Sequence, residues 1–281
     1  MRFWNSAQTK CKGLKGLALL LWLQCGLLDA QDAQPWKLLW TKAEKAEMIF
    51  TDRLGDVYTV QGDALTKYKS NGSLFRIYSN KSLGQITRVD ATNPLKVIVF
   101  YQDLSRVVFV DNTLSESGEP LRLETLDKEQ VSQVCWSYDN GIWLYDPVNF
   151  YLTRLDQRLN INVDIRNLNQ ILGFAPIPNW MEEYGNHLYM SIPGRGILQF
   201  DIFGTYLRTL PIRDAEQFHV AGYFVLYRNK NQELNVYDMK ALQNSAWQIP
   251  GGDFLDFSFV QNKLYVLQRD SLKAYQWILP E

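Results

Sequence analysis

The chain has 281 residues with an ordinary globular balance, 46% apolar and 21% charged, and its formal net charge is −1. That length suits one large domain or two small ones. The sequence contains no block of Lys or Arg to attract nucleic acid, which argues against that class of partner. The 14% of aromatic residues favours β structure.

The first thirty residues have the pattern of a cleaved secretory signal peptide. Four basic side chains come first: Arg2, Lys10, Lys12 and Lys15. The apolar stretch Gly16–Leu28 follows, and it is shorter than the roughly 20 residues that span a bilayer. Ala30 suits the position before the cleavage site, with Gln31 as the first mature residue. The alternative interpretation is an uncleaved N-terminal anchor.

Cleavage would leave residues 31–281 with 25 basic and 29 acidic side chains, a net charge of −4. Cys11 and Cys25 would leave with the signal, so Cys135 alone remains. Neither an intramolecular disulfide nor self-assembly by disulfide is then expected. No second long apolar run follows, so no transmembrane segment is expected in the mature chain. We expect an exported protein. It would be located either in the periplasm or outside the cell, at the cell surface or in the extracellular space.

A phrase of two short apolar runs around a turn recurs six times along the mature chain. The second run of each phrase ends at these positions: Lys69, Asp111, Asp156, Asp201, Asp238 and Gln276. The intervals of 42, 45, 45, 37 and 38 residues, with short strands and turn residues, are typical of a β-propeller or a similar repeat array. Helical solenoids of similar period would need a 3.6-residue apolar spacing, which the sequence lacks.

Each unit is predicted to contain four strands, called A to D in chain order. In the first unit they lie near 46–52, 56–60, 64–69 and 74–79. The B and C runs, such as KVIVFY and RVVFVD, are apolar on both alternating faces, which predicts a sheet packed between two others. The Asp residues that end four of the C strands are expected to bond the backbone of the C–D turn.

The last unit lacks an outer strand, because few residues follow Trp277. The N-terminal end of the mature chain offers a spare one at Trp36–Lys42. Pairing it with Ser271–Trp277 would close the ring and remove two exposed edges. The sequence therefore predicts a single all-β domain within residues 31–281, a six-bladed β-propeller whose sixth blade is closed by the N-terminal strand.

The main irregularity in the repeat is the segment Asn167–Asn186, between the third and fourth units. Its first part could form a helical turn, and two prolines exclude regular helix after it. One interpretation is a long connector that packs on the edge of a blade. The other is a partner-binding loop, and for it we predict Phe174, Ile177 and Trp180 as the anchoring side chains.

Two stretches resemble NHL-like propellers. DRLGDVYTV (52–60) resembles a recurrent phrase of that group, and QFDIFGTYLRTL (199–210) is similar to its turn from strand C to strand D. The repeats of sialidase, kelch, Trp-Asp and quinoprotein propellers do not recur. Taken with the predicted signal, the chain resembles secreted propeller proteins of Gram-negative bacteria. NHL-like proteins bind proteins, RNA or sugars, or act as lactonases and lyases, so the resemblance implies a fold more than a function.

Motifs for catalysis are missing, and the two histidines stand in different units. Calcium-dependent propeller lactonases hold their metal with oxygen ligands from the A strands. In this chain Asp90, Glu182 and Asp256 would have to converge to do the same, and we keep them as metal candidates. The alternative is that they stand at a solvated channel mouth. We expect no cofactor, with calcium as the alternative.

The expected function is a non-enzymatic protein–protein interaction module, because a rigid disc offers loops on two faces. The expected partner is another protein of the cell envelope, in an outer-membrane assembly or secretion complex. One alternative is a glycan-binding propeller that uses Trp and Tyr side chains in its loops as stacking platforms. The other is a calcium-dependent enzyme of the lactonase or lyase type.

Overall fold

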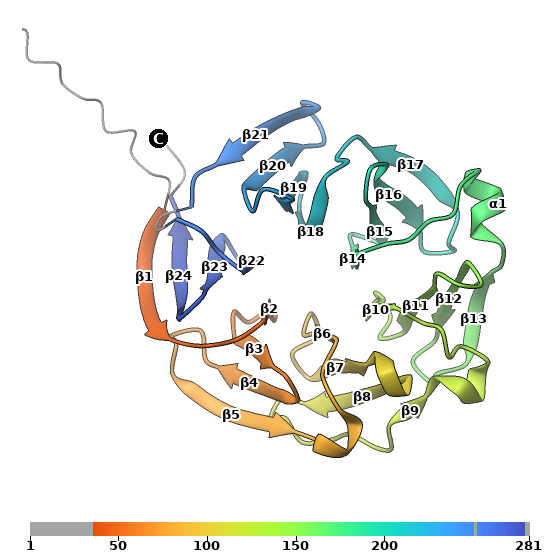
Figure 1. Ribbon diagram of the computed structural model, residues 1–281, viewed down its shortest axis with the longest axis horizontal. Helices are drawn as coiled ribbons and strands as arrows, with labels where there is room; N and C mark the ends of the chain where they lie inside the picture. The colour runs from red at the N-terminus through yellow and green to blue at the C-terminus, as the bar shows by residue number, and fades with distance from the viewer. Residues whose placement is uncertain (1–35, 250–251, 279–281) are drawn as a thin grey trace, which may run out of the picture. The chain divides into compact units, whose positions relative to one another are not determined.

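The computed structural model describes residues 36–249 and 252–278, so the predicted signal peptide at residues 1–30 lies outside the described residues. Residues 36–278 belong to one compact unit. In that unit six sheets of four antiparallel strands follow one another around a ring (Figure 1). The predicted six-bladed β-propeller is therefore confirmed.

The blades are numbered in chain order, and their strands A to D run from the inside of the ring to the outside. Blade 1 contains β2 (Met48–Thr51), β3 (Val57–Gln61), β4 (Ala64–Tyr68) and β5 (Leu74–Ser79). Blade 2 contains β6 (Arg88–Asp90), β7 (Lys96–Tyr101), β8 (Arg106–Asp111) and β9 (Leu121–Arg122). Blade 3 contains β10 (Gln133–Trp136), β11 (Ile142–Asp146), β12 (Tyr151–Leu155) and β13 (Ile161–Ile165).

The remaining blades follow the same order. Blade 4 contains β14 (Trp180–Tyr184), β15 (His187–Ile192), β16 (Gly196–Asp201) and β17 (Tyr206–Leu210). Blade 5 contains β18 (Ala215–Ala221), β19 (Phe224–Asn229), β20 (Leu234–Asp238) and β21 (Gln243–Trp247). Blade 6 contains β22 (Asp256–Val260), β23 (Lys263–Gln268) and β24 (Ser271–Trp277), and its outer strand is β1 (Trp36–Ala43).

Helices are short in the described part of the chain. They are η1 (Lys81–Leu83), η2 (Gln102–Leu104), η3 (Leu123–Leu126) and α1 (Leu168–Leu172). Within the same residues, none of them has the length and apolar character that a membrane-spanning helix needs. The outer strand of blade 2 is reduced to two residues, because η3 takes over directly after β9.

The core consists of layers between neighbouring blades, as the apolar B and C runs predict. In blade 2, strands β7 and β8 are buried along almost their whole length. Alternate side chains of these strands serve opposite faces, so Phe100 and Val107 pack toward blade 3 while Val99 and Val108 join the cluster that includes blade 1. Each blade is thus buried on both faces, which is why its central strands carry no polar stripe.

The N-terminal strand closes the ring as predicted. Strand β1 pairs antiparallel with β24, from Trp36 opposite Trp277 to Ala43 opposite Ser271. Trp40 also ties β1 to blade 1, because its Nε1 donates to the Ser70 carbonyl oxygen at 2.9 Å. The Trp40 ring lies so close to Gly72 that an added Cβ there would meet it at 3.0 Å. That contact and a φ of +83° both require glycine at this turn.

The recurrent aspartates have the turn-forming role predicted for them. In each of four C–D turns one carboxylate oxygen accepts two backbone N–H groups of the turn. These residues are Asp111, Asp156, Asp201 and Asp238. The carboxylates replace hydrogen bonds that the turn backbone cannot make with a strand, so their repetition reflects the repeated turn.

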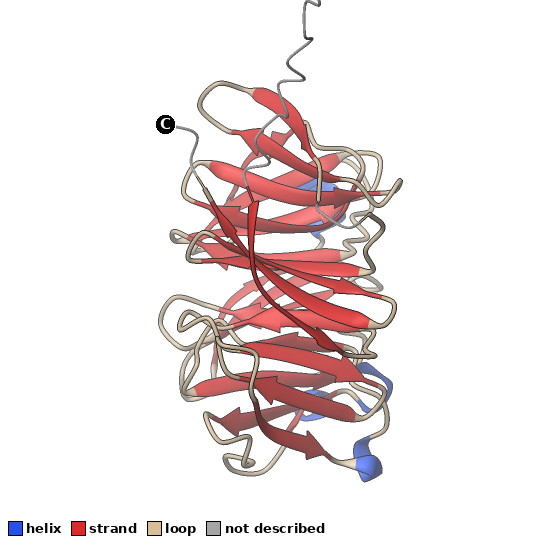
Figure 2. Ribbon diagram, turned by 90° about the vertical axis from the view of Figure 1, so that its left-hand side faces the viewer, coloured by secondary structure: helices blue, strands red, loops and turns tan. Residues whose placement is uncertain are grey.

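All six A strands run in the same direction through the ring, so the six A–B turns lie on one face, which we call the A–B face. The C–D turns lie on it too, while the B–C turns and the blade-to-blade connections lie on the opposite face. Figure 2 shows the ring from its edge, with the loops gathered along its two sides.

Candidate binding face and central cavity

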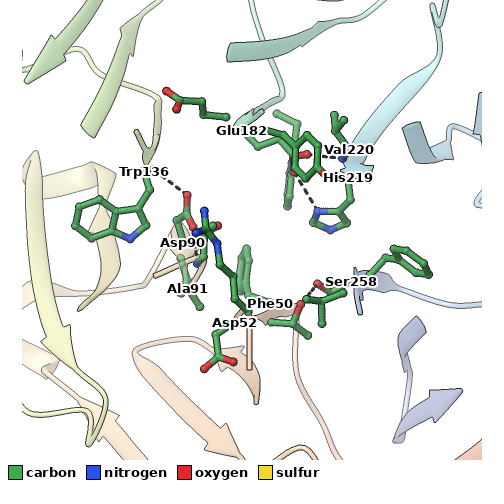
Figure 3. Close-up of a pocket in the computed structure, with 18 of the residues that line it drawn as sticks. Phe50, Asp52, Asp90, Ala91, Trp136, Glu182, His219, Val220 and Ser258 are labelled. Carbon is green, nitrogen blue, oxygen red and sulfur yellow. Dashed lines mark hydrogen bonds and ion pairs between the residues drawn. The ribbon is translucent and has the colours of Figure 1, made fainter. Parts of the chain in front are cut away.

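A cavity of about 450 Å³ lies in the middle of the ring. It is lined by the ends of the A strands and by the A–B turns, with residues from all six blades. It therefore opens on the A–B face. Figure 3 shows Phe50, Asp90, Trp136, Glu182 and His219 around it, each coming from a different A strand.

The floor of the cavity is an arginine stacked on a tryptophan. Arg88 of blade 2 donates from Nη2 to the carbonyl oxygen of Met181 in blade 4, at 2.9 Å. Its guanidinium carbon lies 3.4 Å from the ring centroid of Trp180. The ring of Phe50, from blade 1, is nearly parallel to that of Trp180, at 9° with the centroids 6.3 Å apart. Side chains of three blades thus meet at this floor.

Arg88 is an almost fully buried cation, 8% exposed. Burial lowers the pKa of its guanidinium below the ordinary value, while the charges of Asp90, Glu182 and Asp256 act in the opposite direction. None of these carboxylates forms an ion pair with it in the described part of the chain. The Trp180 ring faces the cation and offers the compensation that a desolvated cation–π contact provides.

The three carboxylates predicted as metal candidates instead join neighbouring blades. Each accepts a hydrogen bond from a backbone N–H of the next blade. Asp90 Oδ2 accepts from Trp136 at 2.8 Å, Glu182 Oε1 from Val220 at 2.6 Å, and Asp256 Oδ2 from Ile49 at 2.8 Å. The first two bonds are drawn in Figure 3. A hydrogen bond from a backbone N–H to a carboxylate is strong and charge-assisted, so these three groups link neighbouring blades.

Glu183 repeats this arrangement in the opposite direction. Successive side chains of a strand point to opposite faces, so Glu182 faces blade 5 and Glu183 faces blade 3. Glu183 accepts from the Tyr138 backbone at 2.7 Å, the Ser137 hydroxyl at 2.7 Å and Trp143 Nε1 at 2.6 Å. Its neighbour Glu182 also lies 3.1 Å from His219 Nδ1. Strand β14 therefore holds the blades on both of its sides.

The structure thus places Asp90, Glu182 and Asp256 around the same ring but directs them at different partners. Among the residues it describes, no three acidic, His or Cys side chains come together in a way that could hold a metal ion. The thiol of Cys135 lies buried in strand β10, and burial raises the pKa of that thiol well above its ordinary value. The expected absence of a cofactor and the alternative of calcium binding both stay predictions, for which elemental analysis of the purified protein is the check.

Asp256→Asn should remove part of the pH dependence of stability. Burial raises the pKa of Asp256 above its ordinary value of 3.8, so the folded protein holds this proton more tightly than the unfolded chain. The stabilisation from that proton is complete below the ordinary value and is lost as the pH rises through the raised one. Asn cannot ionise. The free energy of unfolding of the wild type minus that of the variant should therefore fall as the pH rises.

Urea unfolding of both proteins between about pH 4 and pH 8 measures this difference. Other carboxylates titrate in both chains and cancel from it. A difference that stays constant over this range would contradict the burial of an ionisable Asp256.

The connector between blades 3 and 4 packs part of its side chains on the protein and exposes the others. Its first part forms α1, as predicted, and the Pro176 carbonyl oxygen accepts from the Tyr145 hydroxyl at 2.8 Å. Phe174 is half-buried against the core between blades 3 and 4 and lies 4.7 Å from the guanidinium of Arg195. Ile177 is 65% exposed.

Trp180, the third predicted anchor, does not lie in this connector. It is the first residue of strand β14 and is 9% exposed, in the floor of the cavity. Of the three predicted anchors, Ile177 is therefore the one presented to solvent. Whether the connector binds a partner stays a prediction.

A feature that the repeat analysis missed is a ring of exposed apolar side chains at the A–B turns. Five of the six blades place one such side chain in or beside this turn, each between 42% and 70% exposed. These residues are Leu54, Leu95, Tyr138, Tyr184 and Tyr223. The sequence signal was present, since each stands at the end of its A strand or in the turn that follows, but nothing in the sequence showed that the turns share one face.

A second cavity, of about 480 Å³, lies beside the central one between blades 5 and 6. The two share Tyr184, Val220, Phe259 and Val260, so they adjoin on the A–B face. Trp247 and Trp277 form part of its outer wall. Every described residue that lines it is uncharged, so this groove is suited to an apolar group.

No family model and no curated protein matches the chain in sequence. Solved structures match it in fold. The WD40 domain of Neurospora crassa Pan2 is 9% identical, with a TM-score of 0.58 over 86% of this chain and 97% of that one. Virginiamycin B lyase of Staphylococcus aureus is 10% identical, with a TM-score of 0.57 over 85% and 99% of the two chains.

PorZ of Porphyromonas gingivalis, described as an essential bacterial surface component of the type-IX secretion system, is 11% identical. Its TM-score is 0.53, and the match covers 88% of this chain but 39% of PorZ. At such identities these likenesses concern the fold alone, and proteins with very different roles share it. The chain therefore has the propeller fold, while its NHL-like character stays a resemblance in sequence.

Proposed function

We propose that this chain is a non-enzymatic binding module that holds another protein on its A–B face. The observation that carries the proposal is the ring of exposed apolar side chains at five A–B turns. Single exposed apolar residues are normal on any protein, but a repeated set around one opening is typical of an interaction surface. Three of the five are tyrosines, a residue type enriched in interfaces.

The uncharged groove between blades 5 and 6 supports this proposal. It begins at Tyr184, inside the ring of exposed side chains, and continues outward to Trp247 and Trp277. A bulky apolar side chain of a partner could enter it, and such a buried anchor often contributes ~2 kcal/mol or more of binding energy. The carboxylates of the A strands form hydrogen bonds that link neighbouring blades. This favours a binding role for the protein over a catalytic one.

We further propose that the partner is a protein of the cell envelope, in an outer-membrane assembly or secretion complex. Two observations support it. The first thirty residues have the pattern of an export signal, and PorZ, which shares the fold, is described as a surface component of a secretion system. Export itself is tested by measuring the mass of the protein in the periplasmic fraction. That mass should correspond to a chain that starts near Gln31.

Photo-crosslinking tests the A–B face directly. A photoreactive phenylalanine analogue placed at Leu54 or Leu95 should crosslink one partner of defined mass in the native host. The matched controls are Leu104 and Val148, which are also exposed but lie in B–C turns on the opposite face. Crosslinks from the control positions alone, or from none of the four, would reject the A–B face as the interface.

A further inference from the structure

The floor of the central cavity carries hydrogen-bond donors that the protein leaves without acceptors. Arg88 and Trp180 both line the cavity and are both more than nine-tenths buried. Neither Arg88 Nε nor Trp180 Nε1 has a hydrogen-bond partner among the described residues. Both atoms are shielded from solvent by the side chains around them. A buried polar group without a partner costs about 1–3 kcal/mol, so an acceptor in the cavity is recognised where a small shift of either side chain lets its N–H reach that acceptor.

The walls of the cavity carry carboxylate oxygens that can accept further hydrogen bonds. Glu182, Glu183 and Asp90 are held in fixed positions by the backbone N–H groups of neighbouring blades. Each carboxylate has two oxygens with about four lone-pair sites in all, and these fastening bonds leave some of them unused. The walls can therefore accept hydrogen bonds from a ligand without any rearrangement of the ring.

The charges of the lining decide between classes of ligand. Four carboxylates and two guanidinium groups line the cavity: Asp52, Asp90, Glu182, Glu183, Arg53 and Arg88. An anion would meet this excess of negative charge, and a cation would meet Arg88 at the floor. A purely apolar ligand would strip water from all of these groups without replacing its hydrogen bonds. A neutral ligand that both donates and accepts hydrogen bonds avoids all three penalties.

The mouth of the cavity adds aromatic surfaces. Tyr138 and Tyr184 both line it and are 52% and 42% exposed. The C–H groups on one face of a sugar ring pack well on such an aromatic face, and sugar hydroxyls both donate and accept. The volume of about 450 Å³ is in the usual range for small-molecule sites. We propose that the central cavity binds a neutral saccharide, one or two sugar rings in size.

Calorimetric titration and saturation-transfer NMR of residues 31–281 test this, with glucose, galactose, N-acetylglucosamine, maltose and cellobiose as probes. At least one of them should bind. Tyr138→Ala should then raise Kd about tenfold, the loss expected for a stacking residue of hot-spot strength. The matched control is Tyr206→Ala, on the outer strand β17, which should leave Kd unchanged.

Glucuronate and glucosamine serve as charged comparison probes and should bind more weakly than the neutral sugar. Tighter binding of either charged probe, no binding of any neutral probe, or equal effects of the two tyrosine variants would overturn the proposal. The photo-crosslinks at Leu54 and Leu95 do not involve the cavity lining. A failed sugar titration with successful crosslinking would therefore reject the saccharide site and leave the protein-binding face standing.

Discussion

A chain that starts at Glu44, and so lacks strand β1, is expected not to form a stable ring. It would leave β24 as an unpaired edge along its whole length and would remove the buried side chain of Trp36. Truncating a buried tryptophan costs about 3–5 kcal/mol, and each lost ladder hydrogen bond roughly 0.5–1.5 kcal/mol. The total is comparable with the whole stability of a typical domain, about 5–15 kcal/mol.

Circular dichroism and urea unfolding of residues 44–281, compared with residues 31–281, measure this effect. The matched control is Leu39→Ser, which changes an exposed side chain of β1 and keeps the strand, and should shift stability by no more than about 0.5 kcal/mol. A synthetic peptide covering residues 35–44 should restore cooperative unfolding when it is added to the shorter chain. Unchanged stability of the shorter chain would show that β1 does not close the ring.

Trp180→Ala should destabilise the protein by at least about 3–5 kcal/mol, the usual cost of truncating a core aromatic. The substitution opens a cavity in the floor beneath Arg88 and removes the ring that faces its buried charge. It also removes the parallel ring opposite Phe50. Losing the compensation of a buried cation adds to the packing cost, so the effect should exceed that of truncating an aromatic side chain that packs only against apolar neighbours.

Trp180→Phe is the matched control for this effect. Trp180 Nε1 has no hydrogen-bond partner in the described structure, so phenylalanine loses no hydrogen bond and keeps a flat ring under Arg88. Its cost should be smaller, about 1–2 kcal/mol. Ile177→Ala, at an exposed position three residues earlier, should change stability by less than about 0.5 kcal/mol. Equal stabilities of the Ala and Phe variants in urea unfolding would contradict the stacked arrangement.

The assignment of Trp180 as a loop anchor shows how the position of one strand boundary can change the role that is expected of a residue. Between Pro178 and Tyr184 the sequence reads NWMEEY, which has neither strict alternation nor a long apolar run. A strand with one solvent-exposed face alternates polar and apolar residues. A strand whose two faces contact two different blades does not need this alternation. The structure begins β14 at Trp180, and the side chain that resembled a loop anchor is part of the core.

The carboxylates of the A strands carried a similar ambiguity. Oxygen ligands on inner strands are compatible with a metal site, and they are equally compatible with bonds to the backbone of a neighbouring blade. The choice depends on where each side chain points, and for Asp256 the partner is Ile49, more than 200 residues away in the sequence. Such a contact leaves no local pattern, so it could not be predicted without the closed ring.

The sequence by itself determined the number of blades, the positions of their central strands and the closing role of the N-terminal strand. Those properties follow from local periodicity: apolar runs that must be buried on both faces, turns that need Asp or Gly, and an edge strand of blade 6 that lacks a partner. The tertiary structure alone decided which side chains meet at the centre. Arg88, Trp180 and Phe50 come from three blades, and their contact depends on the curvature of the ring, which brings distant A strands together.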